Sequence, residues 1–190
     1  VHCAVSKACS YFNIKLVVIP CLTNGLYDIK LLEKAINNNT ILIIGSTPSY
    51  NLGIIDQVVD LNRIALKHNI PLHLDACIGA FLINFSEHNY GFMLDGVTSI
   101  SADFHKYGNS PKGASSILYK HKNLMKYQYF IDETWSGGIY ASSGFSGSRC
   151  GNIVALTWAT LMHYGIDGYK SKYSNIMEMR EHLVDRINSI

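Results

Sequence analysis

Residues 40–77, TILIIGSTPSYNLGIIDQVVDLNRIALKHNIPLHLDAC, contain two apolar runs separated by a helical pattern. The continuous apolar run 40–45 predicts a strand covered on both faces, and 71–77 predicts a second strand. Between them, 58–68 has helical spacing, at the positions Leu61, Ile64, Ala65 and Lys67. A strand–helix–strand unit favours a right-handed crossover and parallel pairing. The predicted fold class is therefore α/β, a mostly parallel sheet flanked by helices.

Two elements are expected before this unit and two strands after it. Residues 15–20 (KLVVIP) predict a strand closed by proline. Asp28 is suited to cap a short helix, whose buried positions would be Leu31, Leu32, Ala35 and Ile36. Residues 97–102 (VTSISA) and 115–119 (SSILY) predict two further strands of the same sheet.

The last third of the chain has a different pattern. Residues 132–151 are rich in Gly and Ser and predict a long irregular loop, a type that is usually functional or disordered. Residues 152–164 and 169–188 predict two helices, interrupted by Gly165 and Gly168.

Composition excludes several classes of protein. The chain has 190 residues, 48% of them hydrophobic, which excludes disorder and predicts one domain or a large part of one. Sixteen Lys and Arg against fourteen Asp and Glu give a net charge of +2, without the strong, clustered basic excess that is typical of a nucleic-acid binder. No signal peptide and no run of the ~20 apolar residues that a membrane helix needs are present. Five scattered cysteines fit free thiols, and a chain that begins without Met is expected to be a fragment.

Polar residues follow three of the predicted strands. They are Ser46, Thr47 and Pro48 after the first, 75–77 after the second, and 101–108 (SADFHKYG) after the third. In a parallel α/β sheet, ligands bind beyond the carboxyl ends of the strands. The sequence therefore predicts one shared pocket at this edge.

Asp75 closes an apolar strand, where a lone carboxylate is costly to bury. It could cap the next helix, or it could pair with a cationic nitrogen of a ligand and hold that nitrogen protonated. His73, Asp75 and Cys77 also share one strand face, which makes a metal triad conceivable. Ligands two apart on one strand seldom complete a tetrahedral site, so no metal is expected.

Lys106 lies in an otherwise uncharged patch beside His105, Tyr107 and Gly108. It could be an ordinary surface lysine. Its position after a strand and beside aromatic residues favours a desolvated amine, because burial lowers a lysine pKa and a neutral amine is what Schiff-base chemistry requires. With Asp75, this division of labour matches a pyridoxal phosphate site.

The chain as a whole resembles the sphingosine-1-phosphate lyases, a family of group II, fold-type-I pyridoxal phosphate enzymes. Six segments carry the resemblance, among them ISADFHKYGNSPKG, and they are 2–12, 46–56, 70–82, 96–113, 135–151 and 158–169. The resemblance implies that residues 1–190 are the central and C-terminal part of the large domain. The N-terminal segment with its phosphate loop and the C-terminal small domain would then be missing.

The resemblance also implies roles for single residues. Lys106 would be the Schiff-base lysine, His105 its active-site neighbour, Asp75 the partner of the pyridine nitrogen and His2 the imidazole stacked on the cofactor ring. Thr47 and Gly138 would line the cofactor pocket. The glycine-rich loop would contribute to cofactor and phosphate binding, often across a dimer interface, through Tyr140, Ser142, Ser148 and Arg149. Lys112 would be a second lysine for substrate or proton transfer.

The implied reaction is retro-aldol cleavage of a phosphorylated long-chain base into a fatty aldehyde and phosphoethanolamine. The implied cofactor is pyridoxal 5'-phosphate, and the implied assembly is a homodimer with shared sites, in the cytoplasm or on the cytosolic face of a membrane such as the endoplasmic reticulum. Contact with the membrane would come through the substrate or a missing anchor. Three alternatives stay open: an amino-acid decarboxylase of the same superfamily, an inactive binding protein of the same fold, and a metal hydrolase using His73, Asp75 and His105.

Overall fold

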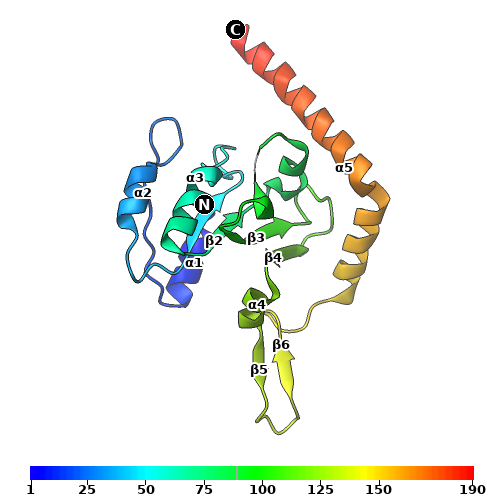
Figure 1. Cartoon of the computed structure of the whole chain (residues 1–190). Coiled ribbons are helices and arrows are strands. Elements are labelled where there is room, and N and C mark those ends of the chain that lie inside the picture. The colour runs from blue at the N-terminus through cyan, green and yellow to red at the C-terminus, as the bar shows by residue number, and fades with distance from the viewer. Residues whose placement is uncertain (89) are drawn as a thin grey trace.

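A four-stranded mixed sheet in the order β1-β2-β3-β4 forms the centre of the chain (Figure 1). The strands are β1 (Ile43–Ser46), β2 (Leu72–Asp75), β3 (Val97–Asp103) and β4 (Ser115–Tyr119), in a computed structural model that describes residues 1–88 and 90–190. The first three strands pair in parallel, and β4 is antiparallel to β3. The predicted α/β class is confirmed, and the antiparallel edge strand makes the sheet mixed.

The helix α3 (Val58–His68) covers one face of this sheet, as its spacing predicts. Leu61 and Ile64 are fully buried, whereas Lys67 points to solvent and donates to Glu33 at 2.6 Å. Glu33 belongs to α2 (Ile29–Ala35), so this ion pair joins the two helices. The Asp28 carboxylate caps α2 by accepting from the amides of Lys30 and Leu31, which confirms the predicted cap. Of the four positions expected to be buried there, Leu32, Ala35 and Ile36 are only half-buried, and Leu31 is exposed.

Short helices make up the remaining connections. The first helix of the chain is α1 (Ala4–Tyr11). Three single turns follow β2, namely η1 (Gly79–Phe81), η2 (Ile83–Phe85) and η3 (Gly91–Met93), while α4 (Lys122–Met125) and η4 (Lys126–Gln128) follow β4.

The expected strand at residues 15–20 is absent from the described chain. The segment is extended, but no ladder pairs it, and of its side chains only Ile19 is half-buried. A β-strand needs a neighbour to satisfy its amides, and no strand of the described chain pairs with this segment.

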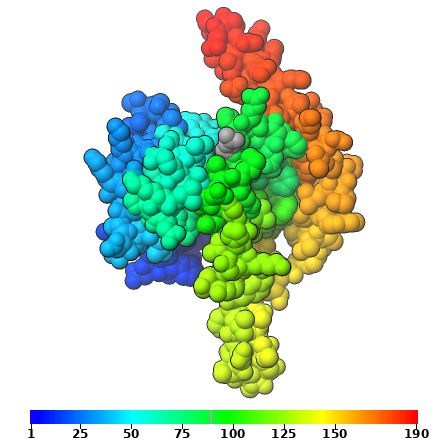
Figure 2. All heavy atoms as spheres, in the orientation of Figure 1, coloured from blue at the N-terminus to red at the C-terminus, as the bar shows by residue number. Residues whose placement is uncertain are grey.

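The expected irregular loop at residues 132–151 contains a strand. β5 (Phe130–Asp132) and β6 (Tyr140–Ser142) pair antiparallel and form a hairpin that projects from the body of the molecule (Figures 1 and 2). The turn residue Gly138 has φ 106°, in the left-handed region that glycine favours. The strands have only three residues each, which is too short for period-two alternation to reveal them.

The last element, α5 (Gly151–Asn188), runs across the molecule and leaves it at its C-terminal end (Figure 1). Gly165 has φ 57° and ψ −173° and breaks the helix there, as the sequence predicts. Gly168 keeps helical geometry, so the expected break at this second glycine is wrong. No helix in the described part of the chain is both long and apolar enough to cross a membrane.

Candidate active site

The carboxyl ends of β2 and β3 bring polar side chains together on one face of the sheet. Asp75 pairs in register with Ser101, and His73 with Ser99. Side chains two residues apart on a strand share a face, so Ser99, Ser101 and Asp103 form one polar row beside His73 and Asp75. The opposite face carries the apolar residues Leu72, Leu74 and Ile100, which pack in the core.

Asp75 is held as a carboxylate although it is partly buried. Its Oδ1 accepts from the Cys77 amide at 3.2 Å and from the Ser101 hydroxyl at 3.0 Å. Burial acts to raise its pKa, but the hydrogen bonds from Cys77 and Ser101 and the nearby His73 outweigh burial and bring the pKa below its ordinary value. Both of these hydrogen bonds end on Oδ1 and neither on Oδ2. An ionised carboxylate in this position is a suitable acceptor for a protonated ring nitrogen.

Lys106 lies in the turn that follows β3, and its side chain returns to the strand end. Its amine donates to Cys77 Sγ at 2.9 Å and lies 3.0 Å from Asp103 Oδ2. Burial acts to lower its pKa, but these contacts with Cys77 and Asp103 outweigh burial and raise the pKa above its ordinary value. The expected neutral, desolvated amine is therefore wrong for this state of the chain: the side chain is 32% exposed and carries a counter-ion.

Cys77 connects the two groups that the sequence predicts for the cofactor. Its amide binds Asp75 and its sulfur accepts from Lys106. Burial raises the pKa of the Cys77 thiol, and the negative charge of Asp75 also acts to raise it. Lys106 acts to lower this pKa but does not outweigh the other two effects. The sulfur therefore contacts Lys106 as a thiol at neutral pH.

His105 is held in place by the backbone of the segment just before β4. Its Nδ1 lies 2.6 Å from the carbonyl oxygen of Ala114, which sets Nδ1 as the protonated nitrogen. Its own amide donates to the same carbonyl at 3.1 Å, and its Nε2 lies 3.7 Å from Asp103. The ring is thus held next to Lys106 in a single orientation.

Thr47 lies at the exit of β1, beside Asp75. Its amide donates to the Asp75 carbonyl at 2.8 Å. The residue is fully buried, yet its hydroxyl has no hydrogen-bond partner in the described chain. A buried hydroxyl without a partner is costly, so this edge of the sheet is suited to a polar group from a ligand.

Taken together, the residues at this edge fit pyridoxal phosphate. Lys106 offers an amine for the aldehyde, and Asp75 offers an ionised carboxylate for the pyridine nitrogen. Thr47 adds an unpartnered hydroxyl. The donor set therefore matches the groups that this cofactor presents.

Two further expected site residues lie at the surface. His2 is exposed, and its Nδ1 accepts from the Ala4 amide at 3.1 Å at the start of α1. Lys112 is exposed in the loop between the Lys106 turn and β4. No hydrogen bond within the described residues joins either side chain to Asp75 or Lys106.

The predicted loop residues lie away from this cluster. Gly138 and Tyr140 belong to the projecting hairpin, and the Ser142 hydroxyl donates to the Gly144 carbonyl. Ser148 and Arg149 are exposed just before α5. Arg149 lines a cavity of about 520 Å³ that also includes Phe104 and Trp158.

The ends of the three parallel strands thus bring some of the predicted residues together, and the expected shared pocket stays a prediction. The structure brings together Thr47, Asp75, His105 and Lys106. It leaves His2, Lys112 and the hairpin residues outside this cluster.

The sequence places Ser101, Asp103 and Cys77 at the strand exits, but sequence reasoning gave Ser101 and Asp103 no role of their own and gave Cys77 only that of a metal ligand. All three contact Asp75 or Lys106. The signal was present in SISAD, because the alternation puts Ser101 and Asp103 on the face of the neighbouring Asp75.

His73 has a structural partner in place of a metal. Its Nδ1 lies 2.8 Å from the Ser99 hydroxyl. Burial lowers the pKa of His73, against the opposing charge of Asp75. Among the described residues, no three His, Cys, Asp or Glu side chains gather as metal ligands.

The chain is similar to several known proteins along its whole length. Sphingosine-1-phosphate lyase 1 of Rattus norvegicus is 41% identical over the whole chain, and the Arabidopsis thaliana sphingosine-1-phosphate lyase is 40% identical. The chain spans only about a third of each relative, 34% and 36% of their lengths.

Among solved structures, the Burkholderia pseudomallei sphingosine-1-phosphate lyase matches the whole chain with a TM-score of 0.97 and 34% identity, over 45% of its own length. A Lactobacillus brevis glutamate decarboxylase matches 97% of the chain with a TM-score of 0.85 at 22% identity, over 44% of its length, which shows a shared fold. The family described as the pyridoxal-dependent decarboxylase conserved domain matches residues 1–189. The chain therefore belongs to the family of the pyridoxal-dependent decarboxylase conserved domain.

Proposed function

We propose that the full-length protein is a pyridoxal phosphate-dependent lyase that cleaves a phosphorylated long-chain base, sphingosine 1-phosphate, into a fatty aldehyde and phosphoethanolamine. The observation that carries this is the cluster at the ends of β2 and β3, where Cys77 links the Asp75 carboxylate to the Lys106 amine. The relatives that share the whole chain at about 40% identity are named for this activity and supply the substrate class.

The residues of the chain have separate tasks in this proposal. Pyridoxal phosphate, when bound, supplies an aldehyde that bonds to amines and a protonated ring that accepts an electron pair. Lys106 holds the cofactor through its amine and is released when the substrate amine takes its place. Asp75 keeps the ring nitrogen protonated, because a buried carboxylate with a low pKa favours the cationic form of its partner.

Other residues are assigned by their position around this pair. His105, fixed by Ala114, lies next to the reacting amine. Thr47 is expected to give its hydroxyl to the cofactor, and His2 to stack on its ring. Lys112 is a candidate for proton transfer, while Tyr140, Ser148 and Arg149 are candidates for a phosphate, which Arg can bind with two parallel hydrogen bonds.

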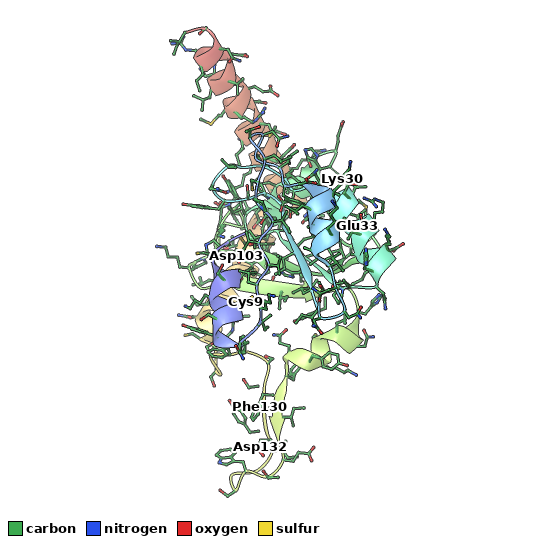
Figure 3. All side chains as sticks on the ribbon, turned by 90° about the vertical axis from the view of Figure 1, so that its left-hand side faces the viewer. Cys9, Lys30, Glu33, Asp103, Phe130 and Asp132 are labelled. Carbon is green, nitrogen blue, oxygen red and sulfur yellow. The ribbon has the colours of Figure 1, made fainter. Side chains whose placement is uncertain are left out.

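We also propose that the chain is the central and C-terminal part of a large domain, and that the whole protein is a homodimer with shared sites at a cytosolic membrane surface. The hairpin supports the dimer. Phe130, Ile131 and Ile139 are all more than half exposed. Figure 3 shows Phe130 on the hairpin, away from the body of the molecule. A closed two-fold dimer is the commonest arrangement that would bury such a surface.

Product analysis of the full-length protein tests the activity. Incubation of the holoenzyme with sphingosine 1-phosphate is expected to release a long-chain aldehyde and phosphoethanolamine in equal amounts, and Lys106→Ala should abolish both. Release of carbon dioxide from an amino acid, with no aldehyde, would instead identify a decarboxylase. No turnover of either substrate in a protein that binds the cofactor would identify a binding protein.

Borohydride reduction tests the lysine separately from the substrate. In the full-length holoenzyme, reduction is expected to fix a pyridoxyl group on the peptide that contains Lys106, the lysine in contact with Cys77. Peptide mass spectrometry locates the group. A pyridoxyl group on Lys112 would overturn the assignment of Lys106.

A further inference from the structure

Asp103, the last residue of β3, makes side-chain contacts that strand pairing alone does not explain. Its side chain is only 13% exposed, and its two carboxylate oxygens contact different partners. Oδ1 accepts from the hydroxyl of Ser115, the residue that faces it on β4. Oδ2 lies 3.0 Å from the Lys106 amine and 3.7 Å from His105 Nε2.

The turn after β3 produces this arrangement. The Lys106 amide bonds back to the Asp103 carbonyl at 3.4 Å, so the two side chains leave the same turn three residues apart. The turn itself is anchored, because the Ser110 amide donates to the Phe104 carbonyl and the buried Tyr169 hydroxyl donates to the Gly108 carbonyl at 2.8 Å. Asp103 and Lys106 are therefore held together by a rigid backbone, in addition to their charges.

The surroundings of Lys106 leave Asp103 as its direct anionic partner. In the segment after β2, the amine contacts the Cys77 thiol. The Asp75 carboxylate lies on the other side of Cys77. From its own segment it meets Asp103 and neighbours His105. A carboxylate at 3.0 Å favours the ammonium form, whereas bonding to an aldehyde requires the neutral amine.

We propose that Asp103 is a positioning residue for Lys106: its carboxylate holds the ε-ammonium beside Cys77 whenever the amine is not bonded to the cofactor. The inference rests on the proposed function, in which Lys106 is released when the substrate amine takes its place. The substrate ammonium must lose a proton before it can react, and the released Lys106 amine can take up that proton. Asp103 would then hold the resulting ammonium close to the reacting atoms. The same contact slows first capture of the cofactor, since the lysine must lose a proton to react.

The test measures the acidity of Lys106 without the cofactor. Full-length protein freed of cofactor is acetylated with acetic anhydride over a range of pH, and the Lys106 peptide is quantified by mass spectrometry. Removing an opposite charge at this distance shifts a pKa by about one unit or more. Asp103→Asn should therefore lower the midpoint of Lys106 labelling and speed labelling about tenfold below that midpoint.

Matched variants define the controls. Asp103→Glu keeps the charge and should restore a midpoint close to that of the original protein. Asp95→Asn removes the corresponding partner of Lys120, at 3.2 Å, and should leave the labelling profile of Lys106 unchanged. An unchanged Lys106 profile in folded Asp103→Asn would overturn the proposal.

Should Asp103→Asn fail to fold, Ser115→Ala replaces it. This variant keeps the carboxylate but removes the hydroxyl that donates to it. The carboxylate then acts more strongly on Lys106, so a small rise in the midpoint of Lys106 labelling is expected, and no shift overturns the proposal.

A second measurement separates this inference from the proposed function. Added pyridoxal phosphate is followed by its visible absorbance as it binds the same protein near neutral pH. Asp103→Asn should capture it faster than the original protein, and Asp103→Glu at the original rate. A labelling shift with unchanged capture would overturn the link between Asp103 and the cofactor. Failure of the borohydride experiment on Lys106 would refute the proposed function while the labelling result stands.

Discussion

At the level of single residues, the charge of the site depends on a balance between burial and hydrogen bonding. Burial alone would make Asp75 harder to ionise and Lys106 easier to deprotonate. In both residues the neighbouring donors and acceptors reverse that effect. The sequence places both residues at strand ends, but period-two patterns carry no information on the strength of these contacts. The predicted neutral amine of Lys106 is wrong for that reason.

Asp75→Asn should separate folding from turnover in the full-length protein. The variant keeps the shape of the side chain, so folding and part of the cofactor affinity should remain. Loss of a charge-assisted contact costs about 1.5–3 kcal/mol, roughly ten- to a hundredfold, and loss of the ring proton adds to the fall in turnover. Asp95→Asn is the matched control, because the Asp95 side chain is 87% exposed. Normal turnover in a well-folded Asp75→Asn would contradict the assigned role.

His73 should make the fold sensitive to mild acid. Burial holds its folded pKa below the ordinary value, so its contribution to stability is complete above about pH 6.5 and is lost as the pH falls through the folded pKa. Thermal unfolding of the full-length protein, measured from about pH 7 down to about pH 5, should show this loss. His73→Gln should lose less stability over the same range. An equal loss in both proteins would place the acid sensitivity elsewhere.

At the level of elements, close backbone packing fixes the edge that carries the site. η1 passes so close to the exit of β1 that a Cβ atom on Gly79 would overlap the carbonyl oxygen of Thr47. Gly79→Ala should therefore displace η1 or β1, and overpacking of this kind costs about 1–3 kcal/mol of unfolding free energy. Gly144→Ala is the control, since nothing lies within 4 Å of its added Cβ, and should change stability by about 0.5 kcal/mol or less. Chemical unfolding of both variants measures the difference, and equal stabilities would contradict the close approach.

Elements that bury their own side chains are predictable from this sequence, and those that depend on other parts of a structure are not. The helix α3 and the strands β1 to β3 are expected close to their observed bounds, because their apolar residues pack together in the core. The strand β4 is expected at its observed bounds although its Ile117 and Leu118 are exposed, and pairing with β3 holds it. Residues 15–20 have the composition of a strand but no neighbour to pair with. The hairpin was missed for the opposite reason, because its pairing is local and too short for a periodic pattern.

The same distinction applies to the site. Asp75 and Lys106 stand out because a charge after an apolar strand is unusual. Asp103 and Ser101 do not stand out, since their effect arises only when β2, β3 and β4 are side by side.

At the level of the whole molecule, apolar surface remains where the chain has no partner of its own. The hairpin and the end of α5 both project from the body (Figure 2). Phe145, just after the hairpin, is 90% exposed, and Met179 on α5 is 74% exposed. Surface of this kind usually marks an interface with protein or membrane. The hairpin also carries Tyr140, so an interface there would bring an expected cofactor residue to another copy.

Complementation between two inactive full-length proteins tests this assembly. Lys106→Ala removes the amine of the strand-end cluster, and Arg149→Ala removes the guanidinium beside the cavity next to α5. If two copies share each site, a mixed dimer contains one site with both groups intact and one with neither. Random exchange of equal amounts gives mixed dimers in about half of the population by the two-fold symmetry of the pair, so roughly a quarter of the normal activity should return. Mixing two batches of Lys106→Ala controls for exchange alone and should give none. Demonstrated subunit exchange without recovered activity would place Arg149 in the same subunit's site or outside any site.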